Sequence, residues 1–196
     1  VLVFDKLCHS CYACSELCPS DALPMKPQKM GEIREYSRGG LTLVESRLQV
    51  GEEQAVPLIH RTQDLIRQRF ATCRWHILDS PPGTSCPVVA ATRHADLVIL
   101  VAEPTPFGLH DLRLAAGTMQ RMGKDFGVVV NRYDIGDEGV DTFCREEGIP
   151  VFGRIPFDHE LAVSYSHGEL AFERVPSLAE ALAQIRSQLE QRMQKP

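Results

Sequence analysis

The sequence predicts an α/β protein with a mostly parallel β-sheet and flanking helices, preceded by a small cysteine-rich segment. Two observations carry this prediction. From about residue 75 onward, short runs rich in Val, Ile and Leu alternate with stretches of helical length, a pattern typical of buried parallel strands joined by crossover helices. Four of the seven cysteines lie close together near the start of the chain, which sets that segment apart.

The predicted elements follow from apolar periodicity and from glycine and proline positions. The predicted strands cover residues 1–4, 32–36, 41–48, 75–79, 95–102, 126–131 and 149–155. The predicted helices cover residues 20–23, 54–70, 87–94, 108–122, 137–147 and 177–193. The strands over 32–36 and 41–48 flank Ser-Arg-Gly-Gly, which predicts a hairpin, with a flexible loop as the alternative.

The cysteine-rich segment has the spacing C-x2-C-x2-C-x3-C-P, at Cys8, Cys11, Cys14 and Cys18. This is the spacing of the bacterial ferredoxin run, whose thiolates hold a [4Fe–4S] cluster and whose fourth cysteine can ligate a second one. A zinc site is the alternative, although zinc sites usually have two separated C-x2-C pairs or added histidines. We therefore expect residues 1–30 to form half of a ferredoxin-like module with one or two [4Fe–4S] clusters.

Composition excludes several classes of protein. The net charge is −5 and no basic stripe is present, which argues against a nucleic-acid partner. The longest strongly apolar run, residues 97–102, is far shorter than the roughly 18 residues that a membrane helix needs. Residues 1–7 lack the apolar centre of a signal peptide. Together with the free-thiol chemistry, this predicts a cytoplasmic protein.

Polar side chains follow three of the predicted strands. Asp79 ends one strand, Asn131 the second, and Asp158 closely follows the third. Ligands of open α/β sheets bind at the carboxyl ends of the strands, where an Asp can hold Mg²⁺ and a carboxamide can pair with the edge of a purine. Each of these residues taken alone could equally be a turn or cap residue.

Taken together, the motifs DSPPGTSCP, EPTPFGLHDL, VVVNR and IPFD resemble the MinD/ParA/Mrp class of deviant-Walker P-loop ATPases. With the cysteine run, the chain resembles the branch of that class that carries an inserted ferredoxin domain. The resemblance spans nearly the whole chain, from Val1 to about Leu170. It implies that residues 31–196 form a partial nucleotide-binding domain of the CobQ/CobB/MinD/ParA type, with a P-loop NTPase-like sheet.

The resemblance also implies ATP with Mg²⁺ as a cofactor and a role for individual residues. Asp79 would serve Mg²⁺ and the attacking water, and Pro82 and Gly83 would belong to the switch II loop. The residues that would surround adenine are Asn131, Arg132 and the segment Pro156 to Asp158. By the same resemblance the protein would be a homodimer whose ATPase state gates the iron–sulfur module, acting with an unidentified redox or iron–sulfur partner.

Two parts of that class are missing from the sequence. The glycine-rich lysine loop that cradles phosphates is absent, because Gly123-Lys124 is followed by Asp125 and a predicted strand. Only one cysteine run is present, where the class usually has two. We expect the chain to be the C-terminal portion of a longer protein, without its first strand, and to show no ATPase activity by itself.

The leading hypothesis is an iron–sulfur, ATP-binding protein whose nucleotide state is coupled to electron transfer or cluster handling. One alternative is a simple ferredoxin-like electron-transfer module with a non-catalytic α/β docking domain. Another is a scaffold for iron–sulfur cluster assembly. An amidotransferase-like ATP enzyme, similar to the cobyrinate synthases, shares the α/β class but leaves the cysteine run unexplained.

Overall fold

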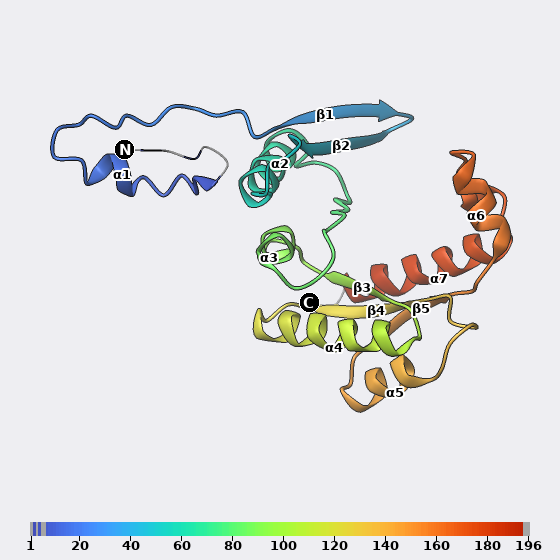
Figure 1. Ribbon diagram of the computed structural model, residues 1–196. Helices are drawn as coiled ribbons and strands as arrows, with labels where there is room; N and C mark the ends of the chain where they lie inside the picture. Colours follow the sequence, from blue (N-terminus) through green and yellow to red (C-terminus); the bar gives the residue numbers. More distant parts are fainter. Residues whose placement is uncertain (1, 3, 5–6, 194–196) are drawn as a thin grey trace. The chain divides into compact units, whose positions relative to one another are not determined.

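The computed structural model describes residues 2, 4 and 7–193 (Figure 1). The chain divides into two compact units. The N-terminal unit comprises Val1–Pro81 and Ser85–Ala91, and the sheet unit comprises Pro82–Thr84 and Thr92–Pro196.

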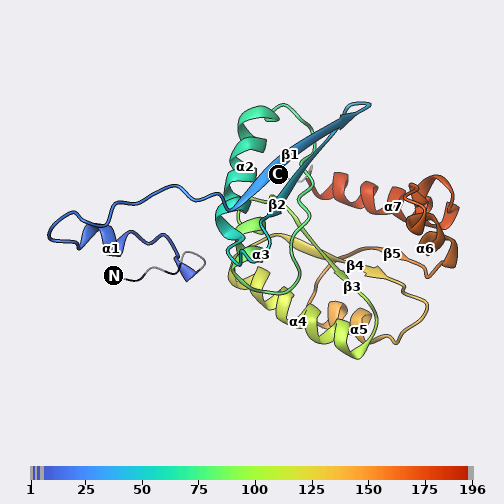
Figure 2. The same ribbon diagram turned by 45° about the horizontal axis from the view of Figure 1, so that its top comes forward.

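The N-terminal unit is built on a β-hairpin and the helix that packs against it (Figure 2). Its elements are α1 (Ala13–Glu16), β1 (Gly31–Arg38), β2 (Leu41–Leu48), α2 (Val56–Arg69) and most of α3 (Cys86–Thr92). β1 and β2 pair antiparallel around a turn at Gly39 and Gly40, whose φ angles of 56° and 83° are left-handed and favour glycine.

The two faces of the hairpin differ in polarity. One face contacts α2, where Ser46 and Thr62 share a hydrogen bond and Gly31 lies against Leu58. On the other face, opposite charges lie directly across the two strands, because Glu32 is in register with Arg47 and Arg34 with Glu45. Such cross-strand pairs are typical of a solvent-facing surface.

The sheet unit is a parallel α/β layer structure (Figure 1). Its strands β3 (Val98–Ala102), β4 (Phe126–Asn131) and β5 (Val151–Ile155) pair in the order β3-β4-β5, and both pairs are parallel. The helical elements of this unit are α4 (Pro106–Arg121), α5 (Gly139–Glu146), α6 (His159–Ser166), η2 (Ala171–Glu173) and α7 (Pro176–Met193).

The central strand β4 is buried from both sides. Val128 and Val130 lie in the cluster that α4 and α5 form on one face, and Val129 packs with Ile185 of α7 on the other. Gly153 of β5 lets α7 approach closely, because a Cβ at this position would lie 2.4 Å from Cγ1 of Ile185. The apolar run of β4 is therefore explained by burial on both faces.

Most predicted elements are confirmed with shifts of a few residues at their ends. The hairpin, the helices of α2, α3, α4, α5 and α7, and the three parallel strands all lie where the sequence placed them. Helix α6 and the short η2 were not predicted. The strand expected over residues 1–4 falls largely outside the described residues.

Two predicted elements are wrong. The helical turn expected over 20–23 is absent, and Asp21 has a left-handed φ of 50°, whereas the short helix α1 forms inside the cysteine run. The strand expected over 75–79 does not form, because these residues have no regular secondary structure and pair with no described strand, and Ile77 is 91% exposed. A strand needs a neighbour to satisfy its backbone groups, and residues 75–79 form no ladder with any described strand.

Candidate functional site

The carboxyl ends of β3, β4 and β5 lie along one edge of the sheet because the three strands are parallel. The residues at this edge are Glu103 after β3, Asn131 and Arg132 at the end of β4, and Pro156 and Phe157 after β5. This edge is the place where doubly wound sheets bind ligands. The structure thus brings together, within one unit, the residues that the sequence singled out at two of these strand ends.

Arg132 is held in a defined position at this edge. Its φ of 52° is left-handed, its Nη1 lies 3.5 Å from Oε1 of Glu103, and its guanidinium carbon lies 5.8 Å from the ring centroid of Phe157. Phe157 remains 48% exposed. A planar cation beside an exposed aromatic ring is a suitable surface for stacking a flat ligand.

The loop that follows Arg132 is fastened to both neighbouring strand ends. Tyr133 N–H donates to the carbonyl of Ile155 (3.1 Å), and Asp137 N–H donates to the carbonyl of Pro104 (3.0 Å). Gly136 sits so close to Pro104 that a Cβ would lie 1.8 Å from its carbonyl oxygen. These backbone contacts hold the loop of residues 133–137 in place and leave the exposed side chains of the candidate site free of them.

Asn131 and Asp158, two further residues at this edge, differ in whether their side chains form hydrogen bonds within the protein. Asn131 is a half-buried residue whose carboxamide makes no hydrogen bond within the described part of the chain, so the carboxamide is available to a ligand. Asp158 caps α6, because its Oδ1 accepts from Glu160 N–H (2.9 Å) and its Oδ2 accepts from the Ser177 hydroxyl (3.4 Å). Asp158 therefore shapes the edge chiefly by anchoring α6 to the start of α7.

The other residues predicted for nucleotide and magnesium lie in the segment before α3. Asp79 is exposed in the N-terminal unit, with no ion pair or hydrogen bond to any described residue. Pro82 and Gly83 belong to the sheet unit and are exposed. Gly83 has a φ of 93°, a conformation that L side chains rarely adopt, so a glycine is needed there.

The four cysteines predicted as cluster ligands do not converge. Cys8, Cys11 and Cys14 are exposed, Cys18 is half-buried, and no group of three metal-ligating side chains forms among the described residues. Hydrogen bonds from the Ser20 backbone and hydroxyl, and from Ala22 N–H at 3.3 Å, lower the pKa of the Cys18 thiol. The donor set thus suits iron–sulfur chemistry, whereas the expected cluster geometry is absent.

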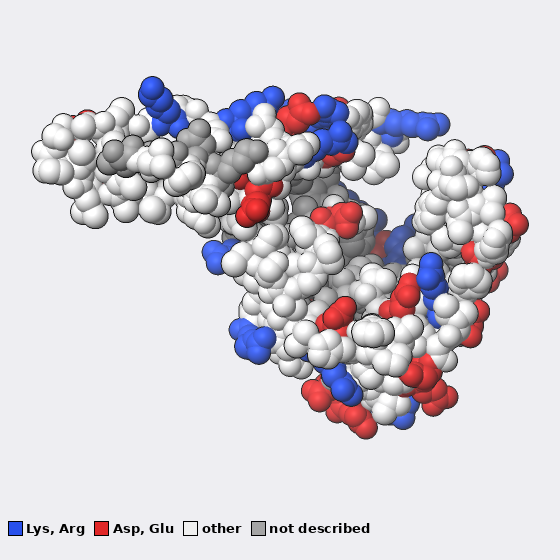
Figure 3. Space-filling view, viewed as in Figure 1, with Lys and Arg blue, Asp and Glu red and all other residues white. Residues whose placement is uncertain are grey.

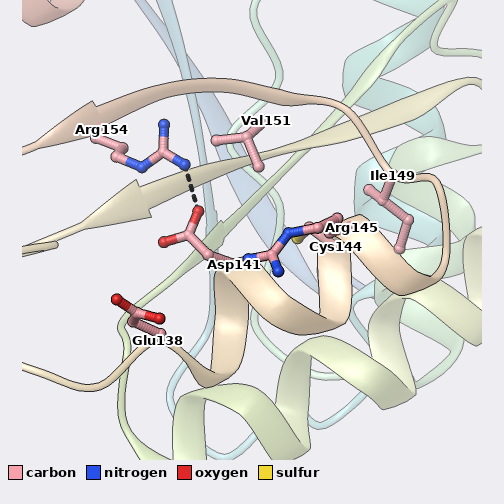
Figure 4. Close-up of a pocket in the computed structure, with 7 residues that line it drawn as sticks. All are labelled: Glu138, Asp141, Cys144, Arg145, Ile149, Val151 and Arg154. Atoms are coloured by element: carbon pink, nitrogen blue, oxygen red, sulfur yellow. Dashed lines mark hydrogen bonds and ion pairs between the residues drawn. The ribbon is translucent and has the colours of Figure 1, made fainter.

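A cavity of about 410 Å³ lies between α5 and β5 (Figure 4). Asp141 and Arg154 form an ion pair across it, and Arg145 and Glu138 line it. Burial raises the pKa of the Cys144 thiol at its base, and the nearby Asp141 carboxylate raises it further. No sequence motif pointed to this cavity, because its residues belong to an ordinary amphipathic helix and an edge strand.

Acidic and basic side chains are interspersed over the face of the molecule drawn in Figure 3. None of the helices in the described ranges is both long enough and apolar enough to cross a membrane.

Comparisons with known proteins give two sequence relatives and, separately, several solved structures of similar fold. No protein-family model matches the chain. An uncharacterised protein of Methanocaldococcus jannaschii is 27% identical over 169 residues, which are 86% of this chain and 58% of the relative. A second protein of the same organism is 23% identical over 152 residues, 78% of this chain and 52% of the relative. The chain therefore spans little more than half the length of the curated relatives that it matches.

Solved structures of similar fold are MinD and ParA ATPases. The MinD cell division protein of Aquifex aeolicus has a TM-score of 0.58 and 20% identity, covering 69% of this chain and 60% of that one. MinD complexed with Mg-ADP, from Pyrococcus horikoshii, has a TM-score of 0.58 and 16% identity, covering 74% and 60%. A ParA family ATPase from Chlorobium tepidum has a TM-score of 0.53 and 21% identity, covering 67% and 56%. The α/β fold of this chain, with its parallel three-strand sheet, is therefore similar to the fold of the MinD and ParA ATPases.

Proposed function

We propose that this chain is the base-binding part of a MinD/ParA-like protein that binds ATP or ADP with Mg²⁺. The observation that carries the proposal is the arrangement at the carboxyl edge of the sheet. The Asn131 carboxamide makes no hydrogen bond to the described residues, and the next residue, Arg132, has its guanidinium beside Phe157. Amide donors and acceptors suit a purine edge, and the Arg–Phe pair suits its face. The MinD relative with bound Mg-ADP supports the ligand class.

In this proposal each residue has a separate task. Asn131 recognises the base, while Arg132 and Pro156 border it and Asp158 holds α6 beside it. Asp79 is a carboxylate without a described partner, and is the candidate for holding Mg²⁺. Bound Mg²⁺ would neutralise charge on the phosphates. Pro82 and Gly83 would form the loop that faces the terminal phosphate.

Hydrolysis is not expected from these 196 residues by themselves. Phosphoryl transfer depends on backbone N–H groups and a lysine that cradle the phosphates, and the sequence contains no such glycine-rich loop. We therefore expect nucleotide binding through the base without turnover.

A titration of a fluorescent ADP analogue with Mg²⁺ tests the base site. We expect Asn131→Ala to weaken binding about tenfold, as the loss of a buried polar contact does. The matched control is Gln120→Ala, which removes a carboxamide from the exposed end of α4. Absence of binding by the unmodified chain, or equal affinity of the Asn131 and Gln120 variants, would refute the proposal.

We further propose that Cys8, Cys11, Cys14 and Cys18 hold a [4Fe–4S] cluster, to which the nucleotide state of a homodimer is coupled through electron transfer or cluster handling. The spacing of the cysteines and their free thiols support this proposal. Metal sites often assemble only when the metal binds, so open thiols are compatible with a site that forms on loading.

Anaerobic reconstitution with iron and sulfide tests the cluster. We expect a brown protein whose iron content falls by at least half in Cys11→Ser, with Cys73→Ser as the control because Cys73 is an exposed cysteine outside the run. A colourless product that holds only zinc would contradict the proposal. A cluster that forms but does not respond to nucleotide would favour the simple electron-transfer module.

A further inference from the structure

Gln63 is a buried polar residue that joins two helices of the N-terminal unit. It lies in the middle of α2, is 6% exposed, and its Nε2 donates to the carbonyls of Ala90 (3.1 Å) and Ala91 (3.0 Å). Both carbonyls lie in the last turn of α3, where carbonyl groups have no hydrogen-bond donor within the helix itself. A single side chain of α2 thus satisfies two terminal carbonyls of α3.

Helix α3 depends on such support because it has only seven residues. Helices of this length are unstable unless other parts of the protein hold them. α3 also closes the segment of residues 80–85, because Val88 and Val89 N–H both donate to the carbonyl of Ser85 (3.0 and 3.2 Å). Ser85, the residue that immediately precedes α3, is thus hydrogen-bonded to the first turn of the helix.

The start of α2 has a contact of a different kind. Nε2 of Gln54, two residues before the first residue of α2, donates to the carbonyl of Cys8 at 2.9 Å. The same helical region is thus hydrogen-bonded to the cysteine segment at its beginning and to α3 in its middle.

The side-chain oxygen of Gln63, Oε1, limits what this residue contributes to stability. Its Oε1 is buried and has no hydrogen-bond partner among the residues that the structure describes. An unsatisfied buried acceptor destabilises a fold by an amount comparable with what one or two hydrogen bonds contribute. Gln63 should therefore add little to global stability, although it fixes the end of α3.

We propose that Gln63 is a positioning residue that holds the end of α3 against α2 within the N-terminal unit. α3 follows directly in the chain on the loop of Pro82 and Gly83, which the proposed function assigns to the terminal phosphate. The meaning of that loop rests on the proposed function, whereas the positioning of α3 does not.

Hydrogen exchange of the full chain, read by mass spectrometry over residues 83–92, tests the inference. Gln63→Met keeps the length of the side chain and removes both its donor and its orphaned acceptor. We expect exchange in α3 to become about tenfold faster, as the loss of two capping hydrogen bonds implies, while the urea midpoint of the whole chain stays nearly unchanged. The control is Gln68→Met, an exposed position of the same helix, which should change neither.

Two results would overturn the inference. One is wild-type exchange in α3 of the Gln63 variant. The other is a fall in global stability that accounts for the faster exchange, since that would make Gln63 an ordinary structural residue. The measurement contains no nucleotide, so failure of the chain to bind ADP would refute the proposed function and leave this result standing.

Discussion

Arg192 joins the last turn of α7 to the start of β4 through a two-pronged contact with Asp125. Its Nε lies 3.1 Å from Oδ1 and 3.0 Å from Oδ2 of Asp125, and its Nη2 contacts Oδ1 as well. This hydrogen bonding lowers the pKa of the Asp125 carboxyl. Both side chains are more than a third exposed, so water screens the pair and its contribution is modest.

The pair makes stability depend on pH in a definite direction. A carboxyl whose pKa is lowered by folding stabilises the protein above its unfolded pKa of about 3.9, and this contribution is lost as pH falls through the lower folded pKa. We expect Arg192→Met to cost about 0.5 kcal/mol at pH 7 and progressively less as the pH is lowered below 4. Urea denaturation over this pH range measures the difference.

The control for this prediction is Arg186→Met, which changes an exposed arginine of the same helix that has no ion pair in the described structure. Its effect should be small and independent of pH. An Arg192 effect of the same size at pH 7 and pH 3 would show that lost packing, rather than the ion pair, is responsible.

At the scale of elements, β3 differs from β4 in what covers it. Val101 of β3 is 66% exposed, whereas Val129, its register partner on β4, is 4% exposed beneath α7. The outer edge of β3 is unpaired among the strands that are described. An exposed apolar edge strand is a template for association with other chains. The chain by itself should therefore aggregate readily.

Lysine substitutions at Val101 and at Val129 distinguish the effect of an exposed edge strand on solubility from the effect of core packing on stability. We expect Val101→Lys to increase the soluble fraction of the chain severalfold and to leave its unfolding midpoint nearly unchanged, because a lysine on an exposed edge discourages strand pairing. Val129→Lys buries an unpaired charge and should prevent folding. Centrifugation after expression, followed by urea denaturation, measures both effects. Equal behaviour of the two variants would contradict the account of β3 as an open edge.

The sequence predicted elements that are buried by helices which themselves have a clear apolar periodicity. β4 has an apolar run because α4, α5 and α7 cover it, and all four could be placed from periodicity. Residues 75–79 have an equally apolar pattern, but strand formation depends on a partner strand, which local sequence does not encode. Propensity alone was therefore insufficient at that segment.

The candidate site was predictable to a similar extent. Strand ends gave Asn131 and Asp158, because polar residues after apolar runs mark the edge of a parallel sheet. That Asp158 caps α6 could not be foreseen, since α6 itself has a weak apolar pattern. Gln63 was also missed, because a buried glutamine on an amphipathic helix has no signal of its own. The cysteine spacing indicated donor chemistry without the geometry that a metal would impose.

The whole molecule consists of two units with different kinds of stabilisation. The sheet unit has apolar clusters on both faces of its sheet. The N-terminal unit has a two-stranded hairpin, one long helix and a cysteine segment, and none of the described residues of that segment is buried. Small units with few buried apolar residues, such as the N-terminal unit, usually rely on a metal or a partner for stability. We therefore expect the two units to respond differently to proteolysis.

Limited digestion with trypsin tests this division. Proteases cut exposed chain that lacks regular hydrogen bonding, and residues 71–79 are exposed and outside any helix or strand. We expect early cuts after Lys29 and Arg74, and a resistant product that begins near residue 75 and retains α4, β4, α5, β5 and α7. Arg113 and Arg121 within α4 should be cut at least tenfold more slowly, because reaching them requires opening of the helix. Cleavage in α4 as early as at Arg74 would mean that the sheet unit does not hold together as an independent folded body, and mass spectrometry of the products over time distinguishes the two outcomes.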